Sequence, residues 1–148
     1  MSFTDPKSLS NAELESGNAF APRFGADGLI FAIAIDAHQG DVLMAAHMNV
    51  DALRLTLETG EVHYFSRSRQ KLWKKGEQSG EVQRLVELRT DCDQDVLMLR
   101  VEMQGRGAAC HTGHRSCFYR RVESAAGTYA LREAGDEPVF DPDEVYHG

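Results

Sequence analysis

The residues best suited to chemistry in this chain are three acids and three cysteines. The run Asp-Cys-Asp-Gln-Asp at residues 91–95 places acids at alternate positions with a cysteine between the first two, and two more cysteines follow at Cys110 and Cys117. Carboxylate oxygens are hard ligands that suit Mg²⁺ or Ca²⁺, whereas thiolates are soft ligands that suit Zn²⁺. The pattern therefore indicates metal chemistry, with two kinds of cation.

The three acids constrain the shape of their own segment. If residues 91–95 are extended, the side chains of Asp91, Asp93 and Asp95 point to one face and that of Cys92 to the other. Neighbouring acids are then about 6.6 Å apart along the strand, too far for three short side chains to chelate one ion. We therefore expect the segment to curve, or the carboxylates to bind through waters, as Mg²⁺ permits.

Two other interpretations of the acids remain open. One is a solvated acidic turn without a metal. The other is an EF-hand loop, since Glu102 falls at its twelfth position, but Val96 stands where that loop requires glycine.

Cys110 and Cys117 bound the motif C-H-T-G-H-R-S-C. The cysteine spacing lacks the close C-x2-4-C pair of small structural zinc modules, so buried, unreactive thiols are an alternative. Two imidazoles in the same eight residues, His111 and His114, favour metal chemistry instead. Three cysteine ligands leave zinc a fourth position for water, as in a catalytic site. Either histidine is a candidate general base or fourth ligand.

A basic stretch with one tryptophan occupies residues 66–80. Its glycines and alternating polar residues predict an exposed segment that presents donors to a ligand. Arginine and lysine side chains bind phosphates, and Trp73 offers a ring face for a flat group. A phosphorylated substrate that carries a nucleobase would suit both. A solvated loop is the alternative. The cations are Arg67, Arg69, Lys71, Lys74 and Lys75.

The elements that must position these residues are mostly strands. Apolar or β-branched runs at 29–35, 42–48, 62–65, 82–90, 96–103 and 118–122 predict strands, with the acids at the junction between two of them. Asn49 predicts the start of a helix of about three turns that ends before Gly60. A short helix is expected near 12–15. This order of elements predicts an α+β fold with mostly antiparallel sheet.

Composition limits the domain count and the partners. The chain has 148 residues, 42% of them hydrophobic and 26% charged, which predicts one globular domain over 1–148 with peripheral, variable ends at 1–25 and 125–148. A net charge of −7 argues against nucleic-acid and membrane-surface binding. No apolar run is long enough for a membrane span, and the start does not look like a signal peptide. We therefore expect a cytoplasmic protein with reduced cysteines.

Four motifs follow one another in the chain: V-L-M-x-A-x-M-N at 42–49, S-R-S-R-x-x-L-W-x-K-G at 66–76, D-C-D-x-D at 91–95, and A-C-H-T-G-x-x-S-C-F at 109–118. Together they closely resemble the phosphoribosyl-AMP cyclohydrolase family of histidine biosynthesis. The resemblance runs from about Ile30 to Tyr119. It implies hydrolysis of the N1–C6 bond in the adenine ring of 1-(5-phosphoribosyl)-AMP, a nucleotide substrate, by a zinc-bound water.

The resemblance also implies an assembly and roles for particular residues. The fold would be an intertwined homodimer whose sheets curl into a pseudo-barrel capped by helices. Zn²⁺ would be held by Cys92, Cys110 and Cys117, shared between the two chains, and His111 would be the general base. Mg²⁺ would be held by Asp91, Asp93 and Asp95. We expect the substrate to be bound by Arg67, Arg69, Lys71, Trp73, Lys75, Ser79 and His114.

The chain departs from the family pattern at few positions. Gln78 stands where the family usually has threonine, which puts a hydroxyl contact there in doubt. The pyrophosphohydrolase domain of some relatives does not follow, so the preceding step is expected on another polypeptide. A second hypothesis is a non-catalytic module in which the three cysteines and one histidine form a closed structural zinc site.

Overall fold

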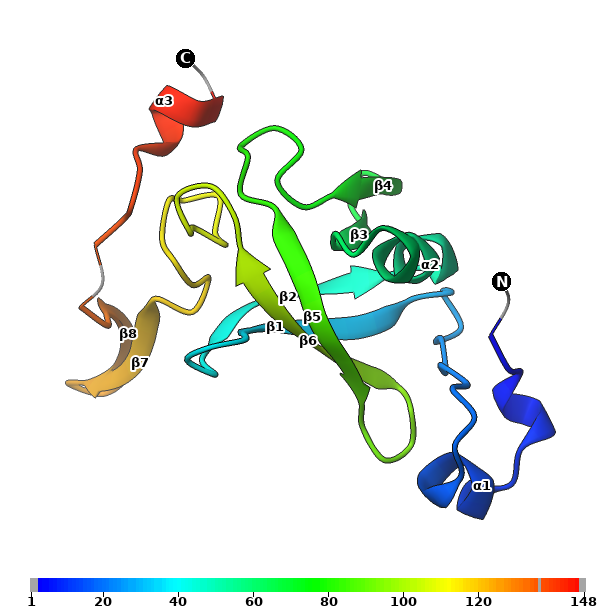
Figure 1. Ribbon diagram of the computed structural model, residues 1–148. Helices are drawn as coiled ribbons and strands as arrows, with labels where there is room; N and C mark the ends of the chain where they lie inside the picture. Colours follow the sequence, from blue (N-terminus) through cyan, green and yellow to red (C-terminus); the bar gives the residue numbers. More distant parts are fainter. Residues whose placement is uncertain (1–2, 136, 147–148) are drawn as a thin grey trace.

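The computed structural model describes residues 3–135 and 137–146, and its centre is a four-stranded sheet in the order β2-β1-β6-β5 (Figure 1). These strands are β1 (Ile30–Asp36), β2 (Val42–Met48), β5 (Gln83–Thr90) and β6 (Val96–Met103). Two hairpins stand beside the sheet: β3 (His63–Ser66) with β4 (Lys71–Lys74), and β7 (Arg120–Ala125) with β8 (Thr128–Glu133). The helical elements are η1 (Pro6–Ser8), α1 (Asn11–Ser16), α2 (Val50–Thr59) and α3 (Pro142–Tyr146).

The core lies between the central sheet and α2. Alternate residues of β1 and β6 are buried, as the two-residue period of a strand requires: Ile30, Ala32, Ala34, Leu97, Leu99 and Val101. Ala52 and Leu53 of α2 belong to the same buried cluster. Asn49 caps α2 by accepting a 2.8 Å hydrogen bond from the Ala52 amide, and Gly60 ends the helix with φ of 74°. The segment expected from Asn49 to Gly60 therefore forms the predicted helix.

The register of the sheet defines two ends of β6. β1 pairs antiparallel with β2 and parallel with β6, so that Phe31 lies opposite Val96 and Asp36 opposite Val101. The β5–β6 turn with the three acids is at the Val96 end. The β1–β2 turn is at the other end, about 17 Å away by the rise of five strand residues.

The predicted α+β class is confirmed, and the pairings are mostly antiparallel, with β1–β6 as a parallel pair. The expected pseudo-barrel is wrong for the residues described: β2 and β5 are outer strands that do not pair with each other. Four strands are fewer than the roughly five to eight with which small barrels close.

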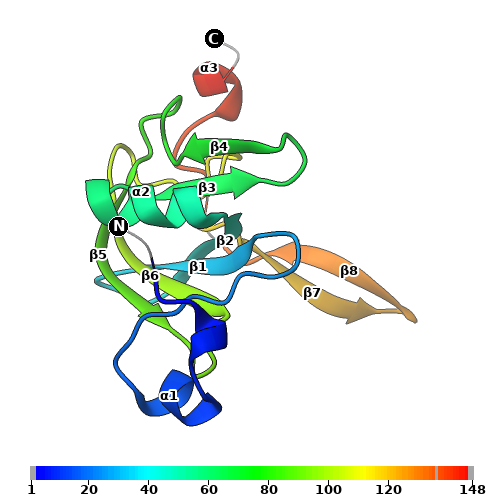
Figure 2. The ribbon, with the colours of Figure 1, turned by 90° about the vertical axis from the view of Figure 1, so that its right-hand side faces the viewer.

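Several elements were not expected from the sequence. The basic stretch was expected as a surface segment but forms β4, and β8 and α3 were not predicted. The last predicted strand starts later, at Arg120, and extends into a hairpin that projects from the body of the protein in both views (Figure 2). Over residues 3–135 and 137–146, no helix has the length and apolar character of a membrane span.

Candidate active site and metal centres

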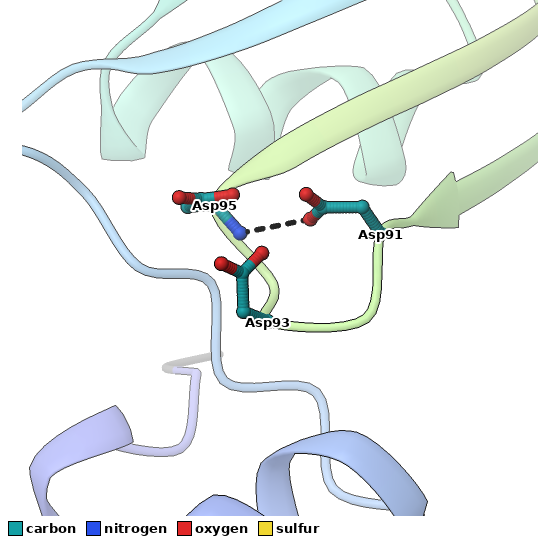
Figure 3. Close-up of side chains that lie close together, drawn as sticks. All are labelled: Asp91, Asp93 and Asp95. Atoms are coloured by element: carbon teal, nitrogen blue, oxygen red, sulfur yellow. Dashed lines mark hydrogen bonds between the residues drawn. The ribbon is translucent and has the colours of Figure 1, made fainter.

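The acid loop, residues 91–95, curves as the three carboxylates require. Asp91, Asp93 and Asp95 each offer an oxygen within 4.8 Å of the others (Figure 3). Asp91 Oδ1 accepts hydrogen bonds of 3.0 Å from the amides of Asp95 and Val96, which closes the turn. β6 starts at Val96, so the EF-hand alternative fails: its loop does not continue past the acids. The oxygens can bind one hard cation.

Mutual repulsion is strong in this loop. The carboxylates of Asp93 and Asp91 share hydrogen bonds with Asp95 and raise its pKa to about 6. Although partial burial opposes the charged form of Asp91, its pKa is lowered by hydrogen bonds from Val96 and Asp95. The three carboxylates are so close that Asp95 keeps its proton up to about pH 6. A divalent cation would neutralise their repulsion and therefore fits this loop.

The cysteine loop, residues 110–117, is fixed to the opposite end of the sheet. The Cys117 amide donates a 2.7 Å hydrogen bond to the carbonyl of Leu43 in β2, and Ser116 Oγ donates to the carbonyl of Val42 at 2.8 Å. Arg115 forms ion pairs with Asp36 and Asp41, the residues that flank the β1–β2 turn. These contacts place both thiols beside β2.

Within the loop, Cys110 and Cys117 form a thiol pair. A hydrogen bond from the Cys117 thiol lowers the pKa of Cys110 to about 5, against the effect of burial, and the Thr112 hydroxyl lowers it further. The same hydrogen bond raises the pKa of Cys117, because Cys117 holds the shared proton. Two adjacent soft donors, one of them readily ionised, fit a zinc ion.

Behind Cys110 lies a chain of hydrogen bonds that the sequence did not reveal. Thr112 Oγ1 donates to Cys110 Sγ at 3.0 Å and lies 3.0 Å from His114 Nδ1. With the one hydroxyl proton directed to the sulfur, the matching tautomer of His114 is the one that donates from Nδ1. The His114 ring is 5% exposed and stacks on Tyr119 at a centroid distance of 3.6 Å. His114 is thus placed behind the thiol pair.

Cys92 does not meet the other two cysteines within one chain. It is exposed in the acid loop and borders a shallow cavity with residues of the N-terminal segment such as Leu14 and Phe20. The cysteine loop is bound to Leu43, at the other end of the sheet. A zinc ion needs all its sulfurs within about 2.3 Å, which this separation precludes. In the part of the chain that the structure describes, one group of three or more His, Cys, Asp or Glu side chains is close enough together to hold a metal ion, and it consists of Asp91, Asp93 and Asp95.

A cavity of about 540 Å³ opens beside the thiol pair, and most of the predicted substrate residues line it. The cysteine loop forms one wall, and β4 with the turn that follows it forms the other. The lining includes Arg69, Trp73, Lys75, Ser79, His111 and Cys117. The structure thus brings the predicted base, one predicted zinc ligand and four predicted substrate contacts to one place.

A second cavity of about 620 Å³ adjoins the first and is lined by the β3–β4 turn. Arg67 faces this second cavity, while Arg69 and Trp73 line both. Trp73 is held by Tyr64, whose ring lies 5.3 Å from it. Two residues predicted to bind substrate lie elsewhere: Lys71 is exposed at the start of β4, and His114 is buried behind the thiols.

Lys75 and Glu81 connect the two walls. Lys75 is 5% exposed, and burial lowers its pKa, while the thiols and Glu81 nearby favour its charged form. The Glu81 carboxylate is fully buried and accepts hydrogen bonds from the amides of Arg106, Gly107 and Ala108 at 2.9–3.2 Å. It therefore fixes the chain that leads into Cys110. Gly76 belongs to the same junction: its φ is 87°, and a Cβ there would lie 2.4 Å from the Glu81 carbonyl carbon.

Sequence reasoning did not identify Glu81, Thr112, Gln94 or Tyr146. Thr112 and Gln94 lie inside two of the four quoted motifs, and a polar residue between predicted ligands is a usable signal for them. Glu81 carries no such signal. Tyr146 reaches the first cavity from α3, far along the chain.

The fold and the site define a small α+β protein with three clustered carboxylates at one end of its sheet and, at the other, a pair of thiols beside a cavity lined by cationic and aromatic side chains. A family model described as phosphoribosyl-AMP cyclohydrolase matches residues 44–119. The chain is 57% identical over 143 residues to a protein of that name from Nitrobacter hamburgensis, covering 96% of each. It is 59% identical over 136 residues to one from Brucella abortus, covering 92% of this chain and 98% of the relative. The chain belongs to the phosphoribosyl-AMP cyclohydrolase family, hydrolases of histidine biosynthesis.

Proposed function

We propose that this protein hydrolyses the N1–C6 bond of the adenine ring in 1-(5-phosphoribosyl)-AMP. A water oxygen bonds to C6, the C6–N1 bond breaks, and a proton passes to the released nitrogen. The observation that carries the proposal is the cavity in which the thiol loop faces the basic and aromatic hairpin. It offers a soft metal site, an imidazole and phosphate-binding cations together. The relatives named for this reaction support it.

The zinc site we propose is shared between two chains of a homodimer. Cys92 of one chain would join Cys110 and Cys117 of the other, because these cysteines lie at opposite ends of β6 within one chain. Bound there, Zn²⁺ would supply a Lewis acid that activates the attacking water.

His111 is the proposed general base. Its side chain is exposed and lines the first cavity with Cys117, so the imidazole faces the space that the substrate would occupy. A neutral imidazole can accept the proton that the water loses.

The acid loop is the proposed Mg²⁺ site, with Asp91, Asp93 and Asp95 as ligands. In a homodimer that brings Cys92 to the partner's thiols, these carboxylates come to the edge of the same active site. Mg²⁺ with several retained waters can also bind phosphate oxygens there.

Substrate binding is assigned to the two adjoining cavities. The substrate has two phosphates, and cations occur in both cavities, with Arg69 and Trp73 between them. Trp73 provides a ring face for the base, and the arginines provide forked donors for phosphate. The proposed contacts are the predicted residues that line the cavities: Arg67, Arg69, Trp73, Lys75 and Ser79. Lys71 and His114, which lie outside both cavities, are not among them. A cytoplasmic location is part of the same proposal, and nucleic acid is not an expected partner.

The alternative of a closed structural zinc module needs four ligands and no substrate space. The large cavity that Cys117 and His111 share with the basic hairpin does not favour it.

The decisive experiment combines turnover of phosphoribosyl-AMP with two variants, Cys92→Ala and Cys110→Ala. Each variant alone is expected to be inactive and to lack zinc. A heterodimer of the two, purified through different affinity tags, contains one complete site and one site without Cys92 or Cys110. It should recover about half of the wild-type activity, since a twofold dimer has two equivalent sites. A heterodimer as inactive as its parents would contradict sharing, and a wild-type protein without turnover would contradict the function.

A further inference from the structure

Gln94, the residue between the second and third acids of the acid loop, is buried while the acids around it are not. Its exposed fraction is 5%, whereas Asp91, Cys92 and Asp95 are exposed. The Gln94 side chain points away from the carboxylates and into the N-terminal segment, residues 10–23. Both views show this segment beside the β5–β6 turn (Figures 1 and 2).

Gln94 uses its polar groups to hold this segment. Its Oε1 accepts a 2.8 Å hydrogen bond from the Ala21 amide, and its Nε2 donates to the carbonyls of Leu14 and Ala19 at 3.0 and 3.3 Å. Its backbone carbonyl accepts a 2.8 Å hydrogen bond from the Arg23 amide. One residue of the acid loop therefore anchors four points of the N-terminal segment, three through its side chain and one through its backbone.

The backbone of Gln94 produces the curve that brings the acids together. Its φ is 60°, in the left-handed region that non-glycine residues seldom occupy. Its amide donates to the Asp91 carbonyl at 3.1 Å, and this turn folds Asp95 back toward Asp91. The conformation is costly for a glutamine, so the side-chain hydrogen bonds that hold it act together with those from Asp95 and Val96 to Asp91 in keeping the carboxylates clustered.

We propose that Gln94 couples the N-terminal segment to the acid loop, so that docking of residues 10–23 and binding of a divalent cation stabilise each other. The proposal rests on the cation site of the proposed function. The physical basis is reciprocity: if the docked segment holds the loop in its cation-binding curve, the cation must favour docking by the same factor. Gln94 is then a positioning residue that touches neither cation nor substrate.

A purely structural role for Gln94 predicts a different result. If Gln94 only packs the segment, its removal loosens residues 10–23 but leaves the cation affinity unchanged. If it couples them, the cation changes how firmly the segment is held. The Arg23 amide is a suitable reporter, because its acceptor is the backbone carbonyl of residue 94 and survives any side-chain change.

The test compares the wild type with Gln94→Ala and Gln94→Asn. Asparagine tolerates the left-handed conformation but is one methylene too short for the three side-chain contacts, so it separates anchoring from backbone strain. Mg²⁺ affinity is measured by calorimetry, and hydrogen exchange of the Arg23 amide is measured with and without Mg²⁺. Gln70→Ala is the matched control, since Gln70 also has positive φ, 49°, but its side chain bonds locally to the Arg67 carbonyl.

In the wild type, Mg²⁺ should slow exchange at Arg23. Both Gln94 variants should bind Mg²⁺ about five- to tenfold more weakly, a usual size for such coupling, and should lose the Mg²⁺ effect at Arg23. Gln70→Ala should behave as the wild type. Unchanged Mg²⁺ affinity in both Gln94 variants overturns the coupling and leaves the cation site standing. Failure of the wild type to bind Mg²⁺ overturns both.

Discussion

The acid loop and the cysteine loop both present side chains that could bind a metal ion, but the chain builds the two loops in opposite ways. The acid loop collects three carboxylates from five consecutive residues, and its turn is closed by hydrogen bonds from Asp95 and Val96 to Asp91. The cysteine loop has two thiols and depends on partners distant in sequence, such as Leu43 and Asp36. One loop supplies its whole set of candidate ligands from neighbouring residues, and the other has two thiols that remote contacts hold in place.

This difference teaches how one short motif can serve two metals. The sulfur of Cys92 is exposed within the acid loop, yet the thiols that would complete its site are fixed to Leu43, toward the other end of the sheet. A second copy of the chain is the simplest source of the missing ligands. The acid loop would then serve its own chain with oxygen and the partner chain with sulfur.

The largest expected effect separates the two metals. Cys110→Ala should abolish zinc binding and activity while Mg²⁺ affinity stays unchanged, because Cys110 offers no oxygen ligand and the three carboxylates all come from the acid loop. Asp93→Asn should weaken Mg²⁺ binding by about ten- to a hundredfold through loss of a charged ligand, and should retain zinc. Elemental analysis measures zinc, and calorimetry measures Mg²⁺. Loss of zinc in Asp93→Asn would show that the carboxylates serve the thiol site.

The acid loop is the one that sequence reasoning described best. Alternate acids in an extended run cannot chelate one ion, so a curve was expected, and the structure has it. The role of Gln94 in this curve could not be predicted from the sequence, because glutamine is uncommon in the left-handed conformation. Its burial also depends on Ala21 and Leu14, some 70 to 80 positions earlier.

The cysteine loop was predictable only in its parts. The position of Cys110 and Cys117 beside β2 could not be predicted, since it depends on ion pairs from Arg115 to Asp36 and Asp41. The basic stretch was expected as an exposed surface segment, and its short strand was not predicted because Leu72 and Trp73, which pack on the core, stand between lysines. Strand β8 could not be predicted from alternating burial, because all of its residues are exposed.

The next effect tests whether the cysteine loop depends on remote support. Glu81→Gln should destabilise the protein by about 2–3 kcal/mol. The NH₂ group of glutamine would face backbone N–H groups whose hydrogen bonds the buried carboxylate accepts, so two donors would meet. Denaturant unfolding measures the change. Glu58→Gln, on the exposed side of α2, is the control and should change stability by a few tenths of a kcal/mol. An effect of Glu81→Gln as small as that control would mean that the loop is held by other contacts.

A smaller effect is expected behind Cys110. Thr112→Val keeps the shape of the side chain but removes the hydroxyl that joins His114 to the sulfur, and should weaken zinc binding about tenfold, the lower end for residues behind a metal ligand. Competition with a chelator measures zinc affinity. Thr128→Val on exposed β8 is the control. Equal zinc affinity in Thr112→Val and the wild type would reduce the hydrogen-bond chain to packing.

The smallest effect concerns the ion pair that ties the cysteine loop to the β1–β2 turn. The hydrogen bond from Arg115 lowers the pKa of Asp41 below its ordinary value of 3.8. The folded state therefore favours the charged carboxylate, so the stability from this pair is complete above about pH 4 and is lost as pH falls through the lowered pKa. Because the Asp41 side chain is 43% exposed, Asp41→Asn should cost less than about 1 kcal/mol near neutral pH. Urea unfolding of wild type and variant from about pH 7 to about pH 3 should show the difference shrinking toward the acid end. A difference that grows as pH falls would mean that Asp41 acts through something other than its charge, and that the cysteine loop is held mainly by its backbone hydrogen bonds to β2.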